Sequence, residues 1–253
     1  MSTIKQSVVW WCAARGGIDH ADLIKRAAKM GYSSVEMSGP DVWPLIHDAG
    51  MEIAIVGGHG TLTNGLNKPE NHDRIEDELS KNIEIAAQNR IPSLIAFSGN
   101  RNGLPDDEGI DICAEGLNRV KKLAEEKNIV VCVELLNSKA DHPDYQCDHT
   151  AWGVELCKKV DSPNVKLLYD IYHMQIMEGD LIRTIRENID HIGHFHTAGN
   201  PGRNDMDETQ EIYYPPIMRA VAETDYDGYV GHEFIPKGDL FSALQAAHDL
   251  CAV

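Results

Sequence analysis

The chain has 253 residues, of which 42% are hydrophobic and 25% are charged, and its formal net charge is -17 at pH 7. This length suits one α/β barrel with a single core as well as it suits two small domains. The negative charge disfavours nucleic acid and anionic membranes as partners, because basic residues occur in runs no longer than two, such as Lys121-Lys122. A small neutral or weakly anionic ligand is the better expectation.

The cysteines and the N-terminus bear on the compartment. The six cysteines form no C-x-x-C pair, which predicts reduced core thiols of a cytosolic protein. The first residues lack the basic and apolar regions of a signal peptide, and no apolar run approaches the roughly 18 residues of a membrane helix. We therefore expect a cytoplasmic protein without a membrane partner. The sequence is compatible with a homo-oligomer but does not define the oligomeric state.

The hydrophobic pattern of the first half predicts alternating strands and helices. Strands are expected at 8–11, 34–37, 52–56 and 93–97. Helices with one apolar face are expected at 19–30, 43–49, 73–88 and 107–127. Asp19 is the predicted N-cap of the first helix, and Gly31 is predicted to close it.

The second half repeats this alternation. Apolar strands are expected to end at Glu134, Asp170, His196 and Glu233, and helices are expected at 150–160, 179–188, about 216–223 and 240–252. Strands that are apolar on both faces indicate a parallel sheet covered by helices, and eight strand-helix units close into a barrel. The sequence therefore predicts an α/β fold, a (β/α)8 TIM barrel, in one domain over residues 1–253.

The four strand ends of the second half carry residues that can bind a metal ion. The carboxyl ends of barrel strands lie around one rim, so the four side chains are expected to come together. Three carboxylates and one imidazole suit Mn²⁺ or Mg²⁺ first, and Co²⁺ or Zn²⁺ second. One carboxylate at a strand end is ordinarily a helix cap or a loop anchor, but four potential ligands at equivalent positions favour a metal site. The predicted ligands are Glu134, Asp170, His196 and Glu233.

Four residues in segments that follow predicted strands are candidates for substrate binding. His173 lies past a strand end, where it faces the pocket or caps a helix. Arg203 lies in a loop that can hold a guanidinium over a carboxylate or hydroxyls, although a loop Arg is ordinarily solvated. His59 and Glu211 are weaker candidates. We assign three other histidines to structure, because they flank strand ends or alternate away from the proposed ligands: His191, His194 and His232.

The second half contains five motifs in order: V-E-L-L-N (133–137), Y-D-I-Y-H-M-Q (169–175), H-T-A-G-N-P-G-R (196–203), Q-E-I-Y-Y-P (210–215) and H-E-F-I-P (232–236). Together they resemble the motifs of the hydroxypyruvate isomerase family within the xylose-isomerase-like barrel superfamily. The resemblance implies a divalent metal held by the four residues above. It also implies that Glu134 and Glu233 act as proton-transfer bases, and that His173 and Arg203 contact the substrate.

The chain also departs from that family. Residues 210–214 read Q-E-I-Y-Y where the family usually has G-E-I-N-Y, the loop 204–209 is acidic, and residues 237–241 replace the usual ending. These departures leave the predicted metal ligands in place and bear on the substrate instead.

The predicted function is metal-dependent isomerisation of a small hydroxy-carbonyl compound of the hydroxypyruvate or tartronate semialdehyde type. The two glutamates would move the proton through an enediolate. A ketose or 3-keto-sugar epimerase or lyase is the alternative on the same site. A metal-dependent endonuclease is disfavoured by the charge of -17 and by the need for more histidines. A non-catalytic sugar-binding barrel is disfavoured by the presence of both glutamates.

Overall fold

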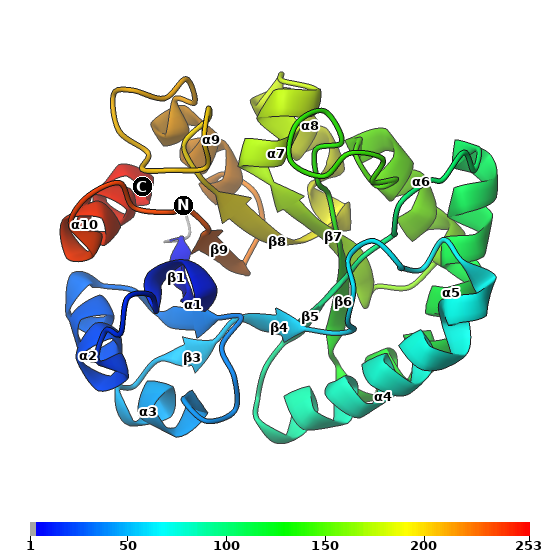
Figure 1. The fold of residues 1–253 in the computed structure, drawn as a ribbon, viewed down its shortest axis with the longest axis horizontal. Helices are drawn as coiled ribbons and strands as arrows, with labels where there is room; N and C mark the ends of the chain where they lie inside the picture. The colour runs from blue at the N-terminus through cyan, green and yellow to red at the C-terminus, as the bar shows by residue number, and fades with distance from the viewer. Residues whose placement is uncertain (1–3) are drawn as a thin grey trace. The chain divides into compact units, whose positions relative to one another are not determined.

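The strands of this protein pair in parallel and alternate with helices (Figure 1). The computed structural model describes residues 4–253. In it the chain divides into two units, each described here by itself. Unit 1 contains residues 4–54, 180–189 and 194–253, and unit 2 contains residues 55–179 and 190–193.

The strands of unit 1 follow the order β3-β2-β1-β9-β8. Their bounds are β1 (Lys5–Val9), β2 (Ser34–Glu36), β3 (Glu52–Ile53), β8 (Ile192–Thr197, in unit 1 from His194) and β9 (Tyr229–His232). In the parallel register, Ser7 pairs with both Ser34 and Gly231, and Gly231 pairs with His196. Because paired residues point to the same face of a parallel sheet, these positions form one row across four strands.

The strands of unit 2 follow the order β4-β5-β6-β7. Their bounds are β4 (Ile55–Gly57), β5 (Ser93–Ala96), β6 (Val130–Glu134) and β7 (Val165–Asp170). Glu134 pairs with Leu168, so β6 and β7 end at nearly the same level. Most of their interior residues are buried and apolar, as expected for parallel strands covered on both faces, although Lys166 and Val56 are only partly buried.

The helices of unit 1 are α1 (Trp10–Ala13), α2 (His20–Met30), α3 (Trp43–Asp48), α8 (Leu181–Asn188), α9 (Tyr214–Ala222) and α10 (Leu240–Cys251). Helix α2 begins and ends as the sequence predicts. The Asp19 side chain accepts a hydrogen bond from the backbone N–H of Asp22, and Gly31 closes the helix at φ 105°.

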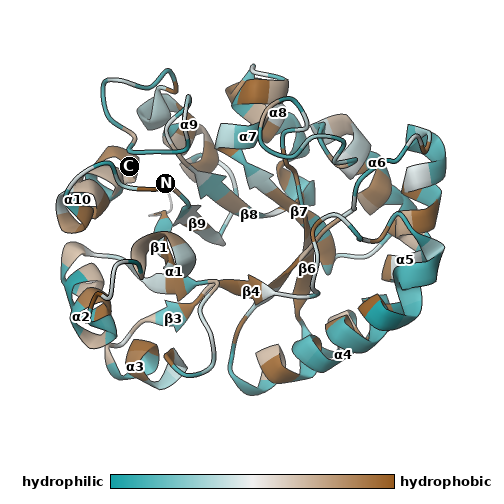
Figure 2. Ribbon diagram, in the orientation of Figure 1, coloured by the Kyte–Doolittle hydropathy of each residue, from teal (hydrophilic) through white to brown (hydrophobic). Residues whose placement is uncertain are grey.

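The helices of unit 2 are α4 (His72–Gln88), α5 (Asp106–Lys127), α6 (Thr150–Val160) and α7 (Ile171–Met177), with a 3₁₀ turn at Pro69–Asn71. A second 3₁₀ turn, Ile189–His191, runs from unit 1 into unit 2. Figure 2 shows polar residues along one side of α4 and apolar residues along the other. The apolar side carries Ile75, Leu79 and Ile83, all of which are buried. This helix therefore packs as its hydrophobic period predicts.

The structure differs from the predicted elements at three places. The first strand ends at Val9, and Trp10–Ala13 form a helical turn. The predicted strand 52–56 is interrupted at Ala54, because its first part pairs with β2 and its second part with β5. The predicted helix 179–188 starts only at Leu181.

Helix α7 is a further element that the sequence pattern did not reveal. It starts directly after β7, and the left-handed residues Gly179 (φ 67°) and Asp180 (φ 46°) separate it from α8. Within residues 4–253, no helix is both long and apolar enough to cross a membrane.

Candidate functional site

His196 and Glu233 come together at adjacent strand ends of unit 1. His196 is the fifth residue of β8, and Glu233 follows directly after β9. The backbone N–H of Glu233 donates to the carbonyl of Thr197 at 2.9 Å, which extends the pairing of the two strands to these residues. Nδ1 of His196 lies 3.0 Å from Oε2 of Glu233, and both side chains are buried. The fold thus unites two of the four predicted ligands.

Two further side chains of unit 1 contact the Glu233 carboxylate. The indole N–H of Trp11 donates to Oε1 at 3.0 Å, and the Arg203 guanidinium forms an ion pair with Oε2. The guanidinium also lies 5.6 Å from the Trp11 ring centroid. Trp11 is 41% exposed, so one face of this cluster is open to solvent. Arg203, a predicted substrate residue, therefore sits beside a predicted catalytic one.

A buried carboxylate lies on the other side of His196. Glu36, the last residue of β2, accepts a hydrogen bond from Nε2 of His196 at 2.7 Å, and Nε2 of His194 lies 3.2 Å from both of its oxygens. Burial alone would raise the pKa of Glu36, but the charge and hydrogen bonds of the two histidines lower it to about 2. Strand alternation places His194 on the same face as His196, so the predicted alternation away from the ligands is wrong for this residue.

His232 on β9 is held differently. Its Nδ1 lies 2.7 Å from the Thr197 hydroxyl and its Nε2 lies 2.7 Å from Oε1 of Gln6, which are both neutral groups. Burial lowers its pKa to about 3, so the ring is neutral. The structural role that the sequence suggests for His232 fits these contacts.

Unit 2 contains the other two predicted ligands. Glu134 is the last residue of β6 and Asp170 is the last residue of β7. A ligand atom of one lies within 4.8 Å of a ligand atom of the other, and both residues are buried. The Tyr145 hydroxyl donates to the Glu134 carbonyl at 2.9 Å and accepts from the backbone N–H of Ser98 at 3.0 Å. This buried phenol fixes the backbone at the end of β6.

His173 lies in the first turn of α7, where Asp170 is the N-cap. Oδ1 of Asp170 accepts a hydrogen bond from the backbone N–H of His173 at 3.0 Å. Nδ1 of the His173 ring lies 2.6 Å from Nδ2 of Asn137. Exchanging the oxygen and nitrogen of the Asn137 amide would break two hydrogen bonds, because Oδ1 accepts from the backbone N–H groups of Ala140 and Asp141. Nδ1 of His173 is therefore the acceptor and Nε2 carries the proton.

The spacing of His196 and Glu233 in unit 1 fits the requirements of a divalent cation. Two ligand atoms that each lie about 2.1 Å from an ion and subtend a right angle are about 3.0 Å apart. The spacing of His196 Nδ1 and Glu233 Oε2 meets this condition. Carboxylate oxygens with one imidazole suit hard to borderline cations. Nε2 of His196 is engaged by Glu36, so Nδ1 is the atom that faces Glu233.

The weaker substrate-binding candidates, His59 and Glu211, form hydrogen bonds with other parts of the chain. Nδ1 of His59 donates to the Gly60 carbonyl at 2.8 Å, and its Nε2 accepts from the backbone N–H of Phe97 at 2.9 Å. Glu211 accepts from the Asn200 side chain at 2.5 Å and closes the loop that carries Arg203. A contact of His59 with substrate remains a prediction.

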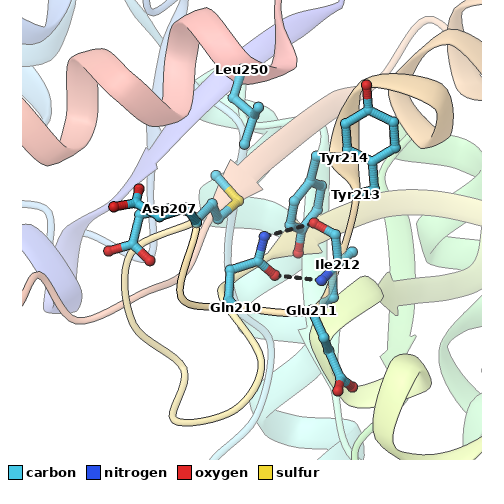
Figure 3. A pocket seen from close by; sticks show the side chains of 9 residues that line it. Asp207, Gln210, Glu211, Ile212, Tyr213, Tyr214 and Leu250 are labelled. Atoms are coloured by element: carbon cyan, nitrogen blue, oxygen red, sulfur yellow. Dashed lines mark hydrogen bonds between the residues drawn. The ribbon is translucent and has the colours of Figure 1, made fainter.

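A separate hollow of about 320 Å³ lies beside the acidic loop of unit 1 (Figure 3). Gln210 closes one wall by exchanging two hydrogen bonds of 2.6 Å with the backbone of Ile212. Tyr213 is 72% exposed at its edge. None of the predicted metal ligands lines this hollow, so it is distinct from the strand-end site.

Comparisons with known proteins extend the description of the fold. A family model described as "Xylose isomerase-like TIM barrel" matches residues 24–250. The chain is 35% identical over 123 residues to the hydroxypyruvate isomerase of Escherichia coli, an alignment that covers 49% of this chain and 47% of that protein. It is 28% identical over 232 residues to the 2-oxo-tetronate isomerase of Pectobacterium atrosepticum, with 86% of this chain and 87% of that protein covered.

A solved structure described as an AP endonuclease, family 2, from Brucella melitensis matches with a TM-score of 0.82 at 24% identity. The match covers 95% of this chain and 97% of that chain, and at this identity it shows the fold alone. In several curated alignments, including the one with the E. coli protein, the chain spans about half the length of the relative. The family match takes in residues of both units, which confirms the predicted (β/α)8 barrel. The domain limits 1–253 remain a prediction.

Three residues at the site were missed by the sequence reasoning. Glu36 ends a strand just as the predicted ligands do, so the pattern Val35-Glu36 was an available signal. Asn137 lies inside the V-E-L-L-N motif but was given no role of its own. Trp11 carried no signal, because its contact with Glu233 joins residues 222 positions apart.

Proposed function

Because this chain belongs to the xylose isomerase-like TIM barrel family, we propose that it is a metal-dependent isomerase of a small hydroxy-carbonyl compound. The substrate would be of the hydroxypyruvate or tartronate semialdehyde type. The observation that carries this proposal is the pair of buried glutamates, Glu134 and Glu233, each at the end of a parallel strand and each beside a second potential ligand. The names of the curated relatives support the same class of reaction.

The proposed metal centre uses both pairs of ligands. In a TIM barrel the carboxyl ends of the strands lie at one face, so Glu134 and Asp170 would join His196 and Glu233 around one ion. Mn²⁺ or Mg²⁺ is the expected ion, with Co²⁺ or Zn²⁺ as substitutes. When bound, the ion supplies Lewis-acid stabilisation of the negative charge that develops on the substrate oxygens.

The proposed reaction moves one proton between two carbons, and a second proton passes from the hydroxyl oxygen to the former carbonyl oxygen. One of the glutamates, Glu134 or Glu233, removes the proton next to the carbonyl, and the other returns a proton at the neighbouring carbon. A free carboxylate has a pKa of about 4.3 and is a weak base at neutral pH, so the reaction depends on close positioning of base and substrate. Nε2–H of His173, which lies 3.6 Å from Oδ2 of Asp170, would donate a hydrogen bond to a substrate oxygen. Arg203 offers positive charge beside Glu233 for an acidic substrate group.

Epimerisation or bond cleavage on a ketose or a 3-keto-sugar is the second candidate. It uses the same two bases, with the proton returned to the opposite face of one carbon. Trp11, which contacts Glu233, is exposed to solvent, and this exposure is compatible with a larger sugar on the Glu233 side of the site. A nuclease is disfavoured by the net charge of -17. A protein that only binds sugars would have no use for two buried glutamates at strand ends.

A deuterium-exchange screen tests the proposal. Hydroxypyruvate, tartronate semialdehyde, ketohexoses and 3-keto-glucosides are incubated in D₂O with the protein and Mn²⁺ or Mg²⁺. After removal of the metal, NMR reads out solvent deuterium at carbon. We expect exchange together with isomerisation for a small hydroxy-carbonyl acid, and exchange with inversion alone would establish the epimerase. No exchange on any compound would overturn both readings.

Two substitutions assign the bases in the same assay. Glu134→Gln and Glu233→Gln each remove one carboxylate charge at nearly constant volume and should abolish turnover while the fold survives. Glu84→Gln is a control with the same chemical change, because this partly exposed glutamate forms a surface ion pair with Lys127. Near wild-type turnover in either active-site variant would show that the bases are wrongly assigned.

A further inference from the structure

A row of small residues gives the Glu36 side chain its path to His196. Glu36 lies on β2, and β1 and β9 separate this strand from β8. Ser7 and Gly231, which pair with each other, lie on the same face of these intervening strands as Glu36, and so does Val9, which pairs with Glu36. A Cβ atom at Gly231 would lie 2.6 Å from Cδ of Glu36. The carboxylate therefore occupies the space that any side chain at position 231 would need.

The burial of this carboxylate is energetically costly. Glu36 and His196 are 0% exposed, and His194 is 1% exposed. A buried charge destabilises a fold unless it is paired and hydrogen-bonded, and well-packed apolar residues would often stabilise the same space better. A purely structural explanation therefore accounts poorly for a carboxylate that extends past two strands.

His232 shows that a buried histidine of this sheet can be satisfied by neutral partners alone. His232 on β9 is equally buried, yet neutral groups, the Thr197 hydroxyl and the Gln6 amide, satisfy its two nitrogens. His196 instead meets a carboxylate on each side, with Glu36 at Nε2 and Glu233 at Nδ1. Only the second of these carboxylates lies at the proposed metal centre.

We propose that Glu36 is the positioning residue of the metal centre, which holds His196 in the tautomer and the orientation that metal binding needs. The carboxylate keeps the proton on Nε2 and makes Nδ1, on the Glu233 side, the ligand atom. A metal-bound histidine that donates its other N–H to a carboxylate is both better oriented and more basic. This inference rests on the proposed metal site. His194 completes the hydrogen bonding of the carboxylate, with its Nε2 lying 3.2 Å from both Glu36 oxygens.

The test measures Mn²⁺ binding to the full-length protein by isothermal titration calorimetry. Glu36→Gln keeps the shape and one acceptor oxygen but removes the charge, and we expect the affinity to fall about 10- to 100-fold. Gly231→Ala should have a similar effect, because it displaces the same carboxylate without changing any charge. Asp148→Asn is the matched control: it makes the same chemical change at a buried carboxylate that binds Arg101 and Ser138, and should leave the affinity unchanged.

Cobalt gives a second readout that damage to the core alone would not change. The d–d absorption bands of the Co²⁺-loaded protein report the ligand field, so Glu36→Gln should shift them and Asp148→Asn should not. Wild-type affinity and unshifted bands in Glu36→Gln would overturn the role of Glu36 alone. If the wild type binds no Mn²⁺, or if Glu233→Gln binds it as tightly as the wild type, the proposed metal centre and this inference are both overturned. A second ion that is lost on replacing His194 would mean that the glutamate and its two histidines are ligands themselves.

Discussion

The indole N–H of Trp11 donates a hydrogen bond to Oε1 of Glu233 at 3.0 Å, across 222 residues of sequence. Trp11→Phe keeps an aromatic ring but removes the donor, so the carboxylate loses one of the contacts that orient it. A hydrogen bond to a charged group contributes about 1.5 kcal/mol, and we expect kcat/KM to fall about tenfold. Steady-state kinetics on the substrate found by the exchange screen measure this. An unchanged kcat/KM would show that the contact has no role in turnover.

Arg203 forms an ion pair with the same carboxylate. Arg203→Gln removes the guanidinium that competes with a metal ion for Oε2 of Glu233. It also removes the positive charge that an acidic substrate group would bind. We therefore expect Mn²⁺ to bind at least as tightly as in the wild type and KM to rise about tenfold or more, as for one lost charged contact. Titration calorimetry and initial rates separate the two effects. Arg203→Lys, which keeps the charge, should recover part of the KM; weaker metal binding in Arg203→Gln would contradict the prediction.

The Asn137 amide donates a hydrogen bond to Nδ1 of His173 and so keeps the ring proton on Nε2. A side chain at position 137 that can only accept hydrogen bonds should move this proton to Nδ1. In Asn137→Asp the carboxylate faces Nδ1 of the ring and favours a proton there, which removes the donor at Nε2. Nitrogen-15 NMR of histidine-labelled protein should show the tautomer change, together with a fall in kcat. Tyr172→Phe is the control, because it removes a hydrogen bond to Asp141 and leaves the contact between residues 137 and 173 intact. An unchanged tautomer in Asn137→Asp would exclude this role.

His59 joins two backbone segments of unit 2 through both ring nitrogens. His59→Gln should lower the free energy of unfolding by about 1–3 kcal/mol, as for buried groups left without their partners. Burial lowers the pKa of His59 below its ordinary 6.5, so the unfolded chain takes up the proton first as the pH falls. The wild type should therefore lose up to about 1.4 kcal/mol per pH unit below 6.5 from this residue, until its lowered pKa is reached.

Urea unfolding at pH 7 and at pH 5 measures this dependence. The difference in stability between the wild type and His59→Gln should narrow at the lower pH, because the variant has no imidazole to protonate. A constant difference would mean that His59 is protonated in the folded protein as readily as in the unfolded chain.

All six cysteines are buried and none forms a disulfide. Burial raises the pKa of five of these thiols, namely Cys12, Cys113, Cys147, Cys157 and Cys251. The native protein should therefore react negligibly with Ellman's reagent, and guanidinium should release six thiols. A fast-reacting thiol in the native protein would contradict the burial.

The strand-end residues could be predicted from the sequence because each apolar run of the second half stops at a polar side chain. Parallel strands then carry such residues to one end of the sheet. Glu36 escaped the same reasoning because the predicted strand 34–37 continued past it to Met37, so Glu36 did not mark the end of an apolar run. Its histidine partners lie 158 and 160 residues further along the chain, a distance at which sequence pattern carries no information on contacts.

Local hydrogen bonds also decided structure that periodicity did not predict. Helix α7 has only seven residues, too few for a helical period to stand out between a strand and Gly179. The break at Ala54 depends on which neighbour each half of the strand pairs with, and pairing is a tertiary property. Asn137 acquires its role only when α7 brings His173 beside it.

Asp170 combines two tasks in one side chain. It caps α7 through Oδ1, a contact of the kind that contributes about 1 kcal/mol, and it is also a proposed ligand. A survey of variants that scores only folded yield would class this aspartate as part of the scaffold, whereas an activity survey would class it as part of the site. Replacement by serine, which can still cap a helix but is a poor ligand, is the change that tells the two classifications apart.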